Sequence, residues 1–506
     1  MTAPAAPPAY DELRKLHRDA ATLNSVGSLL GWDQETYMPP AASAHRADQQ
    51  GLIATLTHER KTTPRIGELL ATCEAAKPSD PDIAANLREM RRDYHLATKL
   101  PGELVAELAK TTSLAQDAWK EARQKSDFAL FAPWLEKVMA LTRRKAECYG
   151  VPPGGELYDA LLDEYEPGMT AREIDAIFIP LRTRLSALVA RIAKSTKKPN
   201  ARLLDLKAPQ TAQHAFGLDI LAAMGFDLNA GRLDTTAHPF CSGMAPGDTR
   251  LTTRYNTDSF LEPLYGTMHE AGHGLYEQGL PKESHWGEPL AEAVSLGLHE
   301  SQSRMWENFV GRSRPFWAWA LPKAAKHLSP LLDGVDLDEI YGAANTVEPS
   351  FIRVEADEAT YNLHIMLRFQ LERELISGRL AINDLPAAWN KTFKDYLGLD
   401  VPDDRRGCLQ DVHWAFGLVG YFPTYTLGNL FAAQFWEKIN ADIPDLDDRM
   451  TRGDFAPLKA WLNTHIHAHG RRYRAAELCQ RITGRPLSAD PLVNHLNTKL
   501  APLYGV

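Results

Sequence analysis

Apolar residues recur every three or four positions along most of this chain, which is the spacing of one buried helix face. The first stripe is formed by Leu13, Leu16, Ala20, Leu23 and Val26. The same spacing predicts further helices over residues 104–123, 174–194, 361–375 and 427–439. No run of strands alternates with these segments, so the pattern predicts an all-α protein.

Residues 235–257 break the helical pattern. They combine the turn sequence Pro246-Gly247-Asp248 with short flanks that favour strands, which predicts a small β-ribbon or hairpin directly before the next helix. The basic, polar stretch 194–202 is expected to be a surface linker. A subdomain boundary is therefore expected near residue 200, within one folded domain over residues 1–506.

Composition narrows the class of protein. The 506 residues are 44% apolar and 24% charged, which is typical of a globular protein, and the formal net charge of −9 gives no basic surface for nucleic acid. Five cysteines, none in a CxxC pair, indicate reduced thiols. The Pro/Ala-rich start lacks the pattern of a signal peptide, and no apolar run approaches the roughly 18 residues of a membrane helix. We expect a soluble, cytoplasmic protein.

The sequence His269-Glu270-Ala271-Gly272-His273 carries the strongest chemical signal. On a helix, residues four apart lie on one face with Cβ atoms about 5–6 Å apart, so both imidazoles can bind one zinc ion. Glu270 then projects beside the ion and can take a proton from the water that the metal activates. An HExxH match also arises by chance in roughly a few chains per hundred of this size, so a third ligand is needed.

Glu300 is the candidate third ligand. It follows His273 by 27 residues (300 − 273) and lies in residues 289–308, which are apolar around much of their circumference and predict a buried helix. A carboxylate there is costly unless it is paired or binds a metal. The alternative, a solvated helix glutamate, loses weight beside HExxH, because catalytic zinc usually takes three protein ligands and leaves one position for water. The neighbouring His299 can equally be a core or cleft histidine.

Further motifs resemble one known family, the thermostable metallocarboxypeptidases of the Thermus aquaticus type. The central motifs are His238-Pro239-Phe240 (HPF), Asp248, Arg250 and Thr252 (DxRxT), His299-Glu300-Ser301-Gln302 (HESQ), Ile352-Arg353 with Ala356-Asp357 (IRxxAD), and Gly407, Gln410, Asp411, His413 and Trp414 (GxxQDxHW). Near the start, Trp32-Asp33-Gln34, Met38-Pro39 and Arg46-Ala47 are also similar to the family. The motifs stand in the family's order, so the resemblance covers most of the chain.

The resemblance implies a single peptidase domain with active-site elements over residues 235–430. It implies an all-α, two-lobed fold with a deep central cleft, like that of neurolysin and angiotensin-converting enzyme, with the small β-ribbon beside the active site. It also implies a homodimer with one Zn²⁺ per subunit, for which Co²⁺ or Mn²⁺ can substitute. The implied activity is removal of C-terminal residues from peptides with broad specificity.

Amide hydrolysis also needs a donor for the oxyanion of the tetrahedral intermediate. Tyr421 and Tyr425 are the best candidates, with His413 next, because the segment is similar to an arrangement in angiotensin-converting enzyme. The alternative for each tyrosine is aromatic packing in the core. The sequence does not decide between these roles.

A carboxypeptidase needs a cation for the substrate's terminal carboxylate, and arginine matches carboxylate geometry. Arg353 is the first candidate and Arg250 the second; a buried structural pair with Glu355 or Asp357 is the alternative for Arg353. His238 is expected to shape the cleft wall, and Gln410 to hydrogen-bond the substrate.

Two other functions stay open. A metallo-oligopeptidase or dipeptidyl carboxypeptidase would use the same metal chemistry, and cleavage of peptides with blocked C-termini separates an endo-acting enzyme from a carboxypeptidase. A non-enzymatic peptide-binding protein would be expected to lack Glu270 or a metal ligand, and here all are present. Peptides are the expected partners, and neither nucleic acid nor a membrane is expected.

Overall fold

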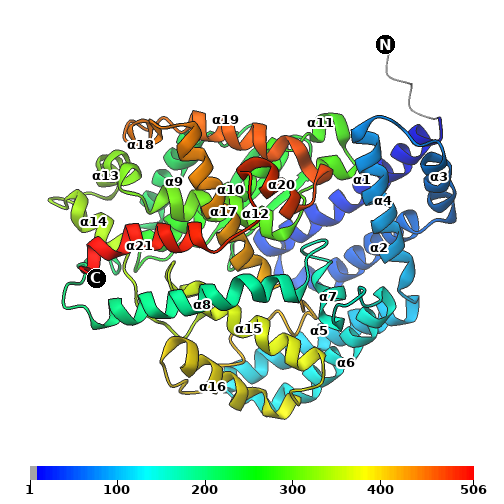
Figure 1. Ribbon diagram of the computed structural model, residues 1–506, viewed down its shortest axis with the longest axis horizontal. Helices are drawn as coiled ribbons and strands as arrows, with labels where there is room; N and C mark the ends of the chain where they lie inside the picture. Colours follow the sequence, from blue (N-terminus) through cyan, green and yellow to red (C-terminus); the bar gives the residue numbers. More distant parts are fainter. Residues whose placement is uncertain (1–7) are drawn as a thin grey trace. The chain divides into compact units, whose positions relative to one another are not determined.

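Helices dominate the structure, a computed structural model that describes residues 8–506 (Figure 1). The Pro/Ala-rich start over residues 1–7 lies outside the described residues. The chain divides into two compact units, each assembled from three segments of sequence. Unit 1 contains the described residues up to Thr98 together with Asn200–Ala344 and Phe435–Pro486, and unit 2 contains Lys99–Pro199, Asn345–Gln434 and Leu487–Val506.

Unit 1 holds the N-terminal helices and the helices that carry the HExxH and HESQ motifs. Its α-helices are α1 (Pro8–Thr36), α2 (Ser43–Lys61), α3 (Pro64–Ala75), α4 (Pro81–Lys99, ending at the boundary), α9 (Gln210–Met224), α10 (Leu261–Gly279), α11 (Lys282–His285), α12 (Leu296–Arg304), α13 (Arg314–Leu328), α14 (Leu337–Ala344), α18 (Leu446–Met450), α19 (Ala456–His465) and α20 (Ala475–Thr483). A π-helical turn over Met305–Gly311 follows α12 directly.

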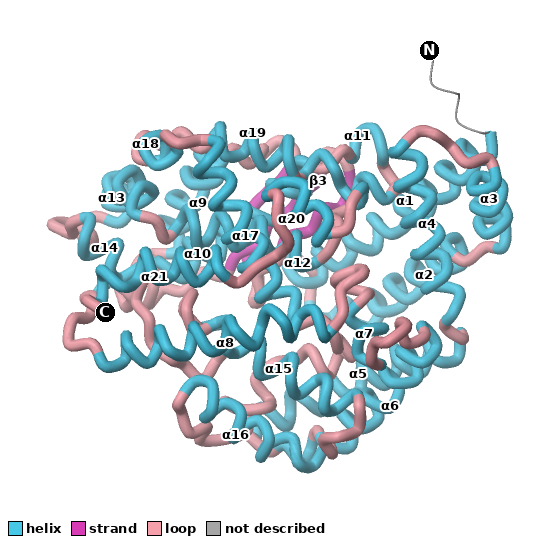
Figure 2. Tube along the Cα trace, in the orientation of Figure 1, coloured by secondary structure: helices cyan, strands magenta, loops and turns pink. Residues whose placement is uncertain are grey.

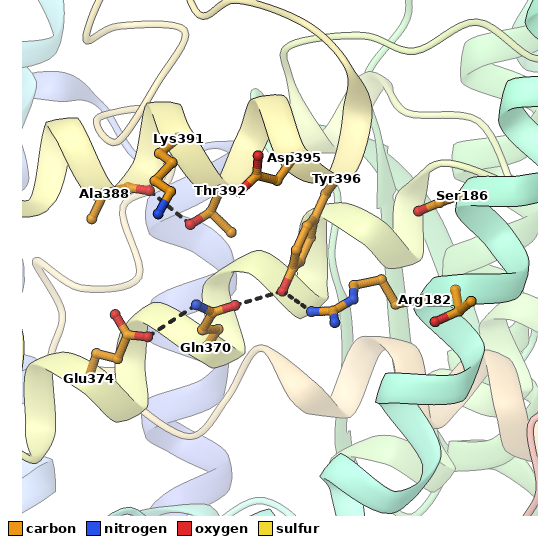
Figure 3. Close-up of a pocket in the computed structure, with 10 residues that line it drawn as sticks. Arg182, Ser186, Gln370, Glu374, Ala388, Lys391, Thr392, Asp395 and Tyr396 are labelled. Carbon is orange, nitrogen blue, oxygen red and sulfur yellow. Dashed lines mark hydrogen bonds between the residues drawn. The ribbon is translucent and has the colours of Figure 1, made fainter.

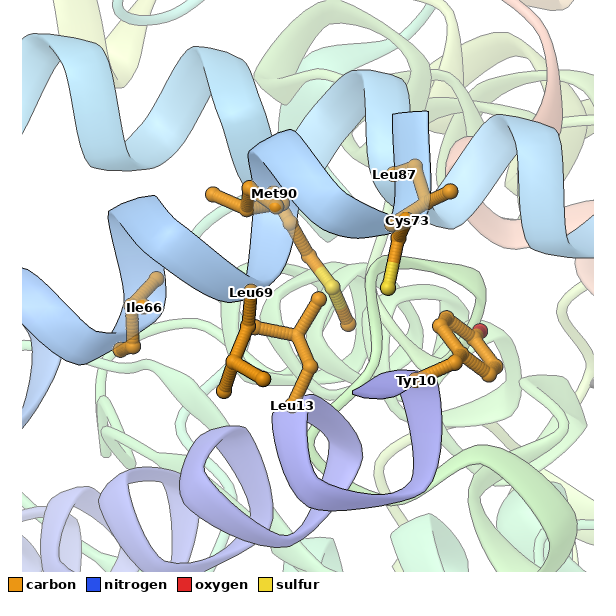
Figure 4. Close-up of a cluster of buried hydrophobic side chains, with 8 residues drawn as sticks. Tyr10, Leu13, Ile66, Leu69, Cys73, Leu87 and Met90 are labelled. Carbon is orange, nitrogen blue, oxygen red and sulfur yellow. The ribbon is translucent and has the colours of Figure 1, made fainter. Parts of the chain in front are cut away.

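Apolar side chains from α1, α3 and α4 form one core cluster of unit 1. Figure 4 shows Tyr10 and Leu13 of α1 facing Leu69 of α3 and Met90 of α4, and Leu13 and Met90 are 0% exposed. The helical spacing of these residues places them on one face of each helix, so burial of that face holds the three helices together.

Helices joined by loops make up unit 2, and its described residues contain no named strand. Its α-helices are α5 (Gly102–Lys125), α6 (Ala132–Tyr149), α7 (Leu157–Leu162), α8 (Ala171–Lys194), α15 (Tyr361–Ile376), α16 (Leu385–Leu397) and α21 (Asp490–Tyr504), and α17 (Pro423–Asp442) contributes residues to both units. A capping box starts α8, because Thr170 accepts from the backbone N–H of Glu173 while the Glu173 carboxylate accepts from that of Thr170.

A three-stranded sheet breaks the helical pattern of unit 1, and Figure 2 shows it as a magenta patch. The strands β1 (Gly231–Thr235), β2 (Cys241–Ala245) and β3 (Asp248–Thr253) lie in the order β1-β3-β2. β2 and β3 form the predicted antiparallel hairpin around Pro246 and Gly247. β1 pairs parallel to β3, Gly231 opposite Thr249, which the sequence pattern did not predict.

The four helices predicted over residues 104–123, 174–194, 361–375 and 427–439 are confirmed by α5, α8, α15 and α17. The first stripe does not stay buried to its end, since Val26 is 42% exposed. The helix predicted over residues 289–308 is wrong at its start, because Pro289–Ala291 is a short 3₁₀ turn and α12 begins only at Leu296. No helix within residues 8–506 is long and apolar enough to cross a membrane.

Candidate metal centre

The two histidines of the HExxH motif lie one turn apart on α10 and face the same carboxylate. Nε2 of His269 lies 3.7 Å from Oε2 of Glu300, and Nε2 of His273 lies 3.5 Å from the same oxygen. Tetrahedral zinc with ligands at roughly 2.0–2.1 Å requires ligand atoms about 3.3–3.4 Å apart. The three side chains therefore fit one metal ion, and their ligand atoms all lie within 4.8 Å of one another.

The sequence brings α12 to α10 through a glycine. An ideal Cβ at Gly272 would lie 2.5 Å from the backbone oxygen of Gln302 and 2.5 Å from Cα of Ser303, closer than any real Cβ contact. Ser295 caps the N-terminus of α12, its hydroxyl accepting from the backbone N–H of Leu298 at 3.0 Å. The cap sets where the helix begins and the glycine sets how near it lies, so Glu300 reaches the two imidazoles.

Arg304 leaves Glu300 one oxygen for the metal. Its Nε donates to Oε1 of Glu300 at 2.7 Å, whereas Oε2 faces the imidazoles. Burial opposes the charged carboxylate, but the charges of Arg304 and His269 outweigh it and hold the pKa of Glu300 well below its usual range. Glu300 is therefore ionised and ready to bind a cation.

Each metal-facing imidazole is held through its other nitrogen. Nδ1 of His269 lies 2.9 Å from Oε2 of Glu307, in the π-helical turn after α12, and Arg304 also donates to that oxygen at 3.1 Å. Nδ1 of His273 lies 2.5 Å from Nδ1 of His299. These contacts leave Nε2 of both histidines to face Glu300, an arrangement that is usual for histidines that bind metals.

Glu270 lies beside the ligands without joining them. It is 7% exposed, and burial, which disfavours the charged form, raises the pKa of its carboxyl to about 7. The group that fits a metal ion contains His269, His273 and Glu300 but not Glu270. A buried carboxyl with such a pKa is suited to accept a proton and return it near neutral pH.

Arg353 of unit 2 lies in a buried cluster of charges. It is 6% exposed; its Nε and Nη2 donate to Oδ1 of Asp411 at 3.0 and 2.9 Å, and its Nη1 donates to the hydroxyl of Tyr361 at 3.1 Å. Arg368 donates to the other oxygen of Asp411 at 2.7 Å. Two guanidinium groups thus share one carboxylate. The structural partner of Arg353 is Asp411, not the acidic side chains within its own motif.

The candidate donors of unit 2 gather around His413. Its Nε2 lies 3.4 Å from the hydroxyl of Tyr425, and the rings of Tyr421 and Tyr425 have centroids 5.4 and 6.3 Å from its own. Burial and the charge of Arg353 lower the pKa of His413 to about 3, so the imidazole is neutral. The hydrogen bonds given for Asp411 go to Arg353 and Arg368 and not to His413.

Gln410 and Glu372 hold the loop that carries His413. The amide of Gln410 accepts from the backbone N–H of Arg353 at 2.9 Å and donates to the backbone oxygen of Phe351 at 3.1 Å. The buried Glu372 accepts from Nε1 of Trp414 at 2.9 Å and from the hydroxyl of Tyr158 at 2.7 Å. Burial raises the pKa of Glu372 to about 7.

Arg250 and His238 belong to unit 1. Arg250, in β3, makes a two-pronged ion pair with Asp248, both contacts 2.8 Å long, and its guanidinium lies 4.3 Å from the ring centroid of Trp32. His238 is exposed in the loop between β1 and β2. His238 is not part of the group whose ligand atoms fit a metal ion.

Unit 2 also contains a polar pocket, lined by residues of α8, α15 and α16. Figure 3 shows Arg182 donating to the hydroxyl of Tyr396, which donates in turn to Gln370 at 2.6 Å, while Gln370 donates to Glu374 at 3.1 Å. The lining groups satisfy one another, and the pocket holds none of the predicted site residues. It gives no indication of chemistry.

Sequence reasoning missed the residues that contact the two histidines of the candidate metal site. Glu307 follows Glu300 by seven residues, two helical turns, so the same spacing rule that paired the histidines could have found it. Glu277 follows His273 by four residues on α10 and could have been found in the same way. Only the structure shows that His299 joins Glu277 to His273.

Comparisons with known proteins cover nearly the whole chain. The family model described as carboxypeptidase Taq (M32) metallopeptidase matches residues 12–500. The chain is 50% identical over 507 residues to thermostable carboxypeptidase 1 of Thermus thermophilus, covering 98% of this chain and 99% of that protein. It is 37% identical over 478 residues to carboxypeptidase 1 of Bacillus subtilis, covering 94% and 95%. The crystal structure of M32 carboxypeptidase from Deinococcus radiodurans matches with a TM-score of 0.95 at 40% identity, covering 99% of this chain and 100% of that chain.

Proposed function

The chain belongs to the carboxypeptidase Taq (M32) family of metallopeptidases and is a metal-dependent carboxypeptidase, and from this premise we propose how its residues hold the metal and cleave peptides. His269, His273 and Glu300 bind one Zn²⁺, with Co²⁺ or Mn²⁺ as substitutes. The observation that carries the proposal is the convergence of both Nε2 atoms, at 3.7 and 3.5 Å, on one oxygen of Glu300. A bound divalent metal supplies a Lewis acid that activates water and polarises the scissile carbonyl.

Glu270 is the general base of the proposal. Its carboxylate takes the proton from the attacking water and delivers it to the leaving amine when the C–N bond breaks. Burial, which raises the pKa of this carboxyl to about 7 in the metal-free chain, supports its role as a group that takes up a proton. Its exclusion from the ligand group supports the same assignment, because a carboxylate that binds the metal cannot also carry a proton.

Tyr421, Tyr425 and His413 are proposed to stabilise the developing oxyanion. A neutral His413, whose pKa is about 3, and the neighbouring tyrosine hydroxyls can donate hydrogen bonds without adding a proton to the reaction. The 3.4 Å contact between His413 and the hydroxyl of Tyr425 supports a shared role for these two groups.

Arg353 is proposed to bind the substrate's terminal carboxylate, with Arg250 as the second candidate. The support is charge: Arg353 and Arg368 share the single carboxylate of Asp411, which leaves the cluster one positive charge in excess. The bidentate pairing of Arg250 with Asp248 neutralises that guanidinium and ranks it second.

His238 and Gln410 are proposed to act on the peptide less directly. The exposed His238 precedes β2, an edge strand whose backbone can pair with an extended peptide. Gln410 acts by holding the backbone of Arg353, to which it is bonded at 2.9 Å. Backbone pairing does not depend on substrate side chains, which supports broad specificity.

Cellular location, assembly and shape complete the proposal. Five free cysteines support a reducing compartment, and we assign the enzyme to the cytoplasm. A homodimer and the two-lobed fold with a deep cleft rest on the family resemblance alone. Sedimentation of the purified chain tests the dimer, and a monomer at micromolar concentration would contradict it.

Mass analysis of a model peptide incubated with the enzyme tests the function. We expect stepwise loss of single C-terminal residues, abolished by a chelator and restored by Zn²⁺. A matched peptide with an amidated C-terminus should be stable. Cleavage of the amidated peptide at internal bonds would indicate an oligopeptidase, and removal of residues in pairs a dipeptidyl carboxypeptidase.

A further inference from the structure

A chain of polar contacts runs from the metal site to the edge strand of the sheet. Nδ1 of His273 lies 2.5 Å from Nδ1 of His299, and Nε2 of His299 lies 2.9 Å from Oε1 of Glu277. Lys282 donates to the other oxygen of Glu277 and lies 3.4 Å from the backbone oxygen of Gly243 in β2. All of these residues belong to unit 1.

The positions of the ring protons on His273 and His299 depend on each other. His273 can bind a metal through Nε2 only if its proton sits on Nδ1. That N–H then points at Nδ1 of His299, which must accept it, so the proton of His299 must sit on Nε2. The Glu277 carboxylate can only accept a hydrogen bond, so it also requires the N–H of His299 to be at Nε2. One arrangement of protons therefore satisfies all three groups.

The opposite arrangement fails at both ends. If His299 carried its proton on Nδ1, its bare Nε2 would face the oxygen of Glu277, and two acceptors would meet at 2.9 Å. Nδ1 of His273 would then have to accept, which places the proton of His273 on the nitrogen that faces Glu300. Glu277 is ionised: despite burial, the hydrogen bond from His299 and the charge of Lys282 lower its pKa to about 2.

We propose that His299 and Glu277 are positioning residues that hold His273 in the tautomer and orientation needed to bind the metal. The inference rests on the proposed metal site, because it takes His273 as a ligand. Groups that hold a ligand histidine in this way typically contribute about 10–100-fold to metal affinity. The HESQ motif then supplies a ligand, Glu300, and the support for another ligand from adjacent positions.

Substitutions at His299 test its contact with His273 and its contact with Glu277 separately. The amide of asparagine can place an acceptor near the Nδ1 position and keep the contact to His273, while losing the reach to Glu277. Glutamine reaches the Nε2 position instead, so it keeps the contact to Glu277 and loses the acceptor for His273. If His299 only filled space, the asparagine and glutamine variants would not differ in metal affinity in this order.

Gly243 gives an independent way to move the carboxylate. An ideal Cβ there would lie 2.0 Å from Oε2 of Glu277 and 2.7 Å from Nζ of Lys282. Both atoms end flexible side chains, so Gly243→Ala can be accommodated by moving them while the backbone stays in place. This variant displaces the carboxylate of Glu277 without removing the charge of Glu277 or of Lys282.

The test is the zinc affinity of the metal-free full chain, measured by competition with a chromogenic chelator. We expect His299→Ala and His299→Gln to weaken binding about 10–100-fold, His299→Asn to lose less than tenfold, and Gly243→Ala to weaken it as well. His214→Ala and Gly266→Ala are matched controls. The imidazole of His214 lies 2.7 Å from the hydroxyl of Tyr255, outside the metal site, and a Cβ at Gly266 would meet Thr253 at 4.0 Å, an ordinary contact.

Thermal melting of each metal-free variant shows whether it is folded, and the visible spectrum of the Co²⁺ form reports the ligand geometry of folded variants. Equal zinc affinities of His299→Asn and His299→Gln, or wild-type affinity in His299→Ala, would overturn the proposed positioning role of His299. Either result would leave the proposed metal site intact. Failure of the wild-type chain to bind Zn²⁺ would instead overturn the proposed function, and the inference with it.

Discussion

Replacing Gly272 with alanine tests whether close contact between α10 and α12 builds the metal site. The added Cβ would lie 2.5 Å from the backbone oxygen of Gln302 and 2.5 Å from Cα of Ser303. Non-bonded carbon atoms prefer about 3.5–4.0 Å, so the two helices must separate by roughly 1 Å. The obstacles are backbone atoms, which cannot swing aside as a side chain can.

The size of the effect follows from that displacement. Overpacking of this kind costs about 1–3 kcal/mol of folding stability. Metal sites hold ligand distances to about 0.2 Å, so a shift of about 1 Å between His273 and Glu300 disrupts the site. We expect zinc affinity to fall by at least tenfold and kcat/KM by about 100-fold even at saturating zinc.

The assay compares Gly272→Ala with Gly266→Ala in the same helix, where a Cβ meets only the hydroxyl of Thr253 at 4.0 Å. Hydrolysis of a peptide with a free C-terminus gives kcat/KM, chelator competition gives zinc affinity, and thermal melting gives stability. Gly272→Ala with the zinc affinity and kcat/KM of the control would refute the view that this glycine sets the distance between the ligands.

Further substitutions test the separate roles. Glu270→Gln should keep zinc affinity and lower kcat by about 10²–10⁴-fold, and full turnover would sink its assignment as the base. Arg353→Ala should cost about 2–5 kcal/mol in kcat/KM for peptides with a free C-terminus, whereas equal losses of residual cleavage for amidated peptides would argue against carboxylate binding. The pKa of Glu372 is about 7 in the folded protein against an ordinary 4.5. At low pH the protonated side chain therefore contributes about 3 kcal/mol to the free energy of unfolding, and this contribution should be lost as the pH rises from about 4.5 to 7. Thermal melting of Glu372→Gln should lack that part of the pH dependence, and parallel profiles for the variant and the wild type would contradict it.

Local sequence patterns were sufficient for several helices and for the shared helix face of two candidate metal ligands. The stripe over residues 174–194 predicted α8, and the four-residue spacing of His269 and His273 predicted their shared face on α10. Both depend on contacts within a few turns of one helix, where the period of 3.6 residues fixes which side chains are neighbours.

Local patterns failed where a neighbour distant in sequence decides the structure. β1 forms because its backbone pairs with β3, and the sequence of Gly231–Thr235 alone does not predict that pairing. Residues 289–295 are apolar enough for a helix, yet Pro289 and the cap at Ser295 delay α12 until Leu296. A buried apolar segment has the same composition whether it is helical or not.

The sequence by itself determined which residues can bind a metal and on which helix face two of them lie, because a helix repeats the same geometry wherever it forms. Only the tertiary structure decided that Glu300 meets both imidazoles, that His299 joins His273 to Glu277, and that Arg353 pairs with Asp411, 58 residues further along the chain. Such contacts depend on how near two elements approach, and that distance is set by packing, here by a glycine between α10 and α12.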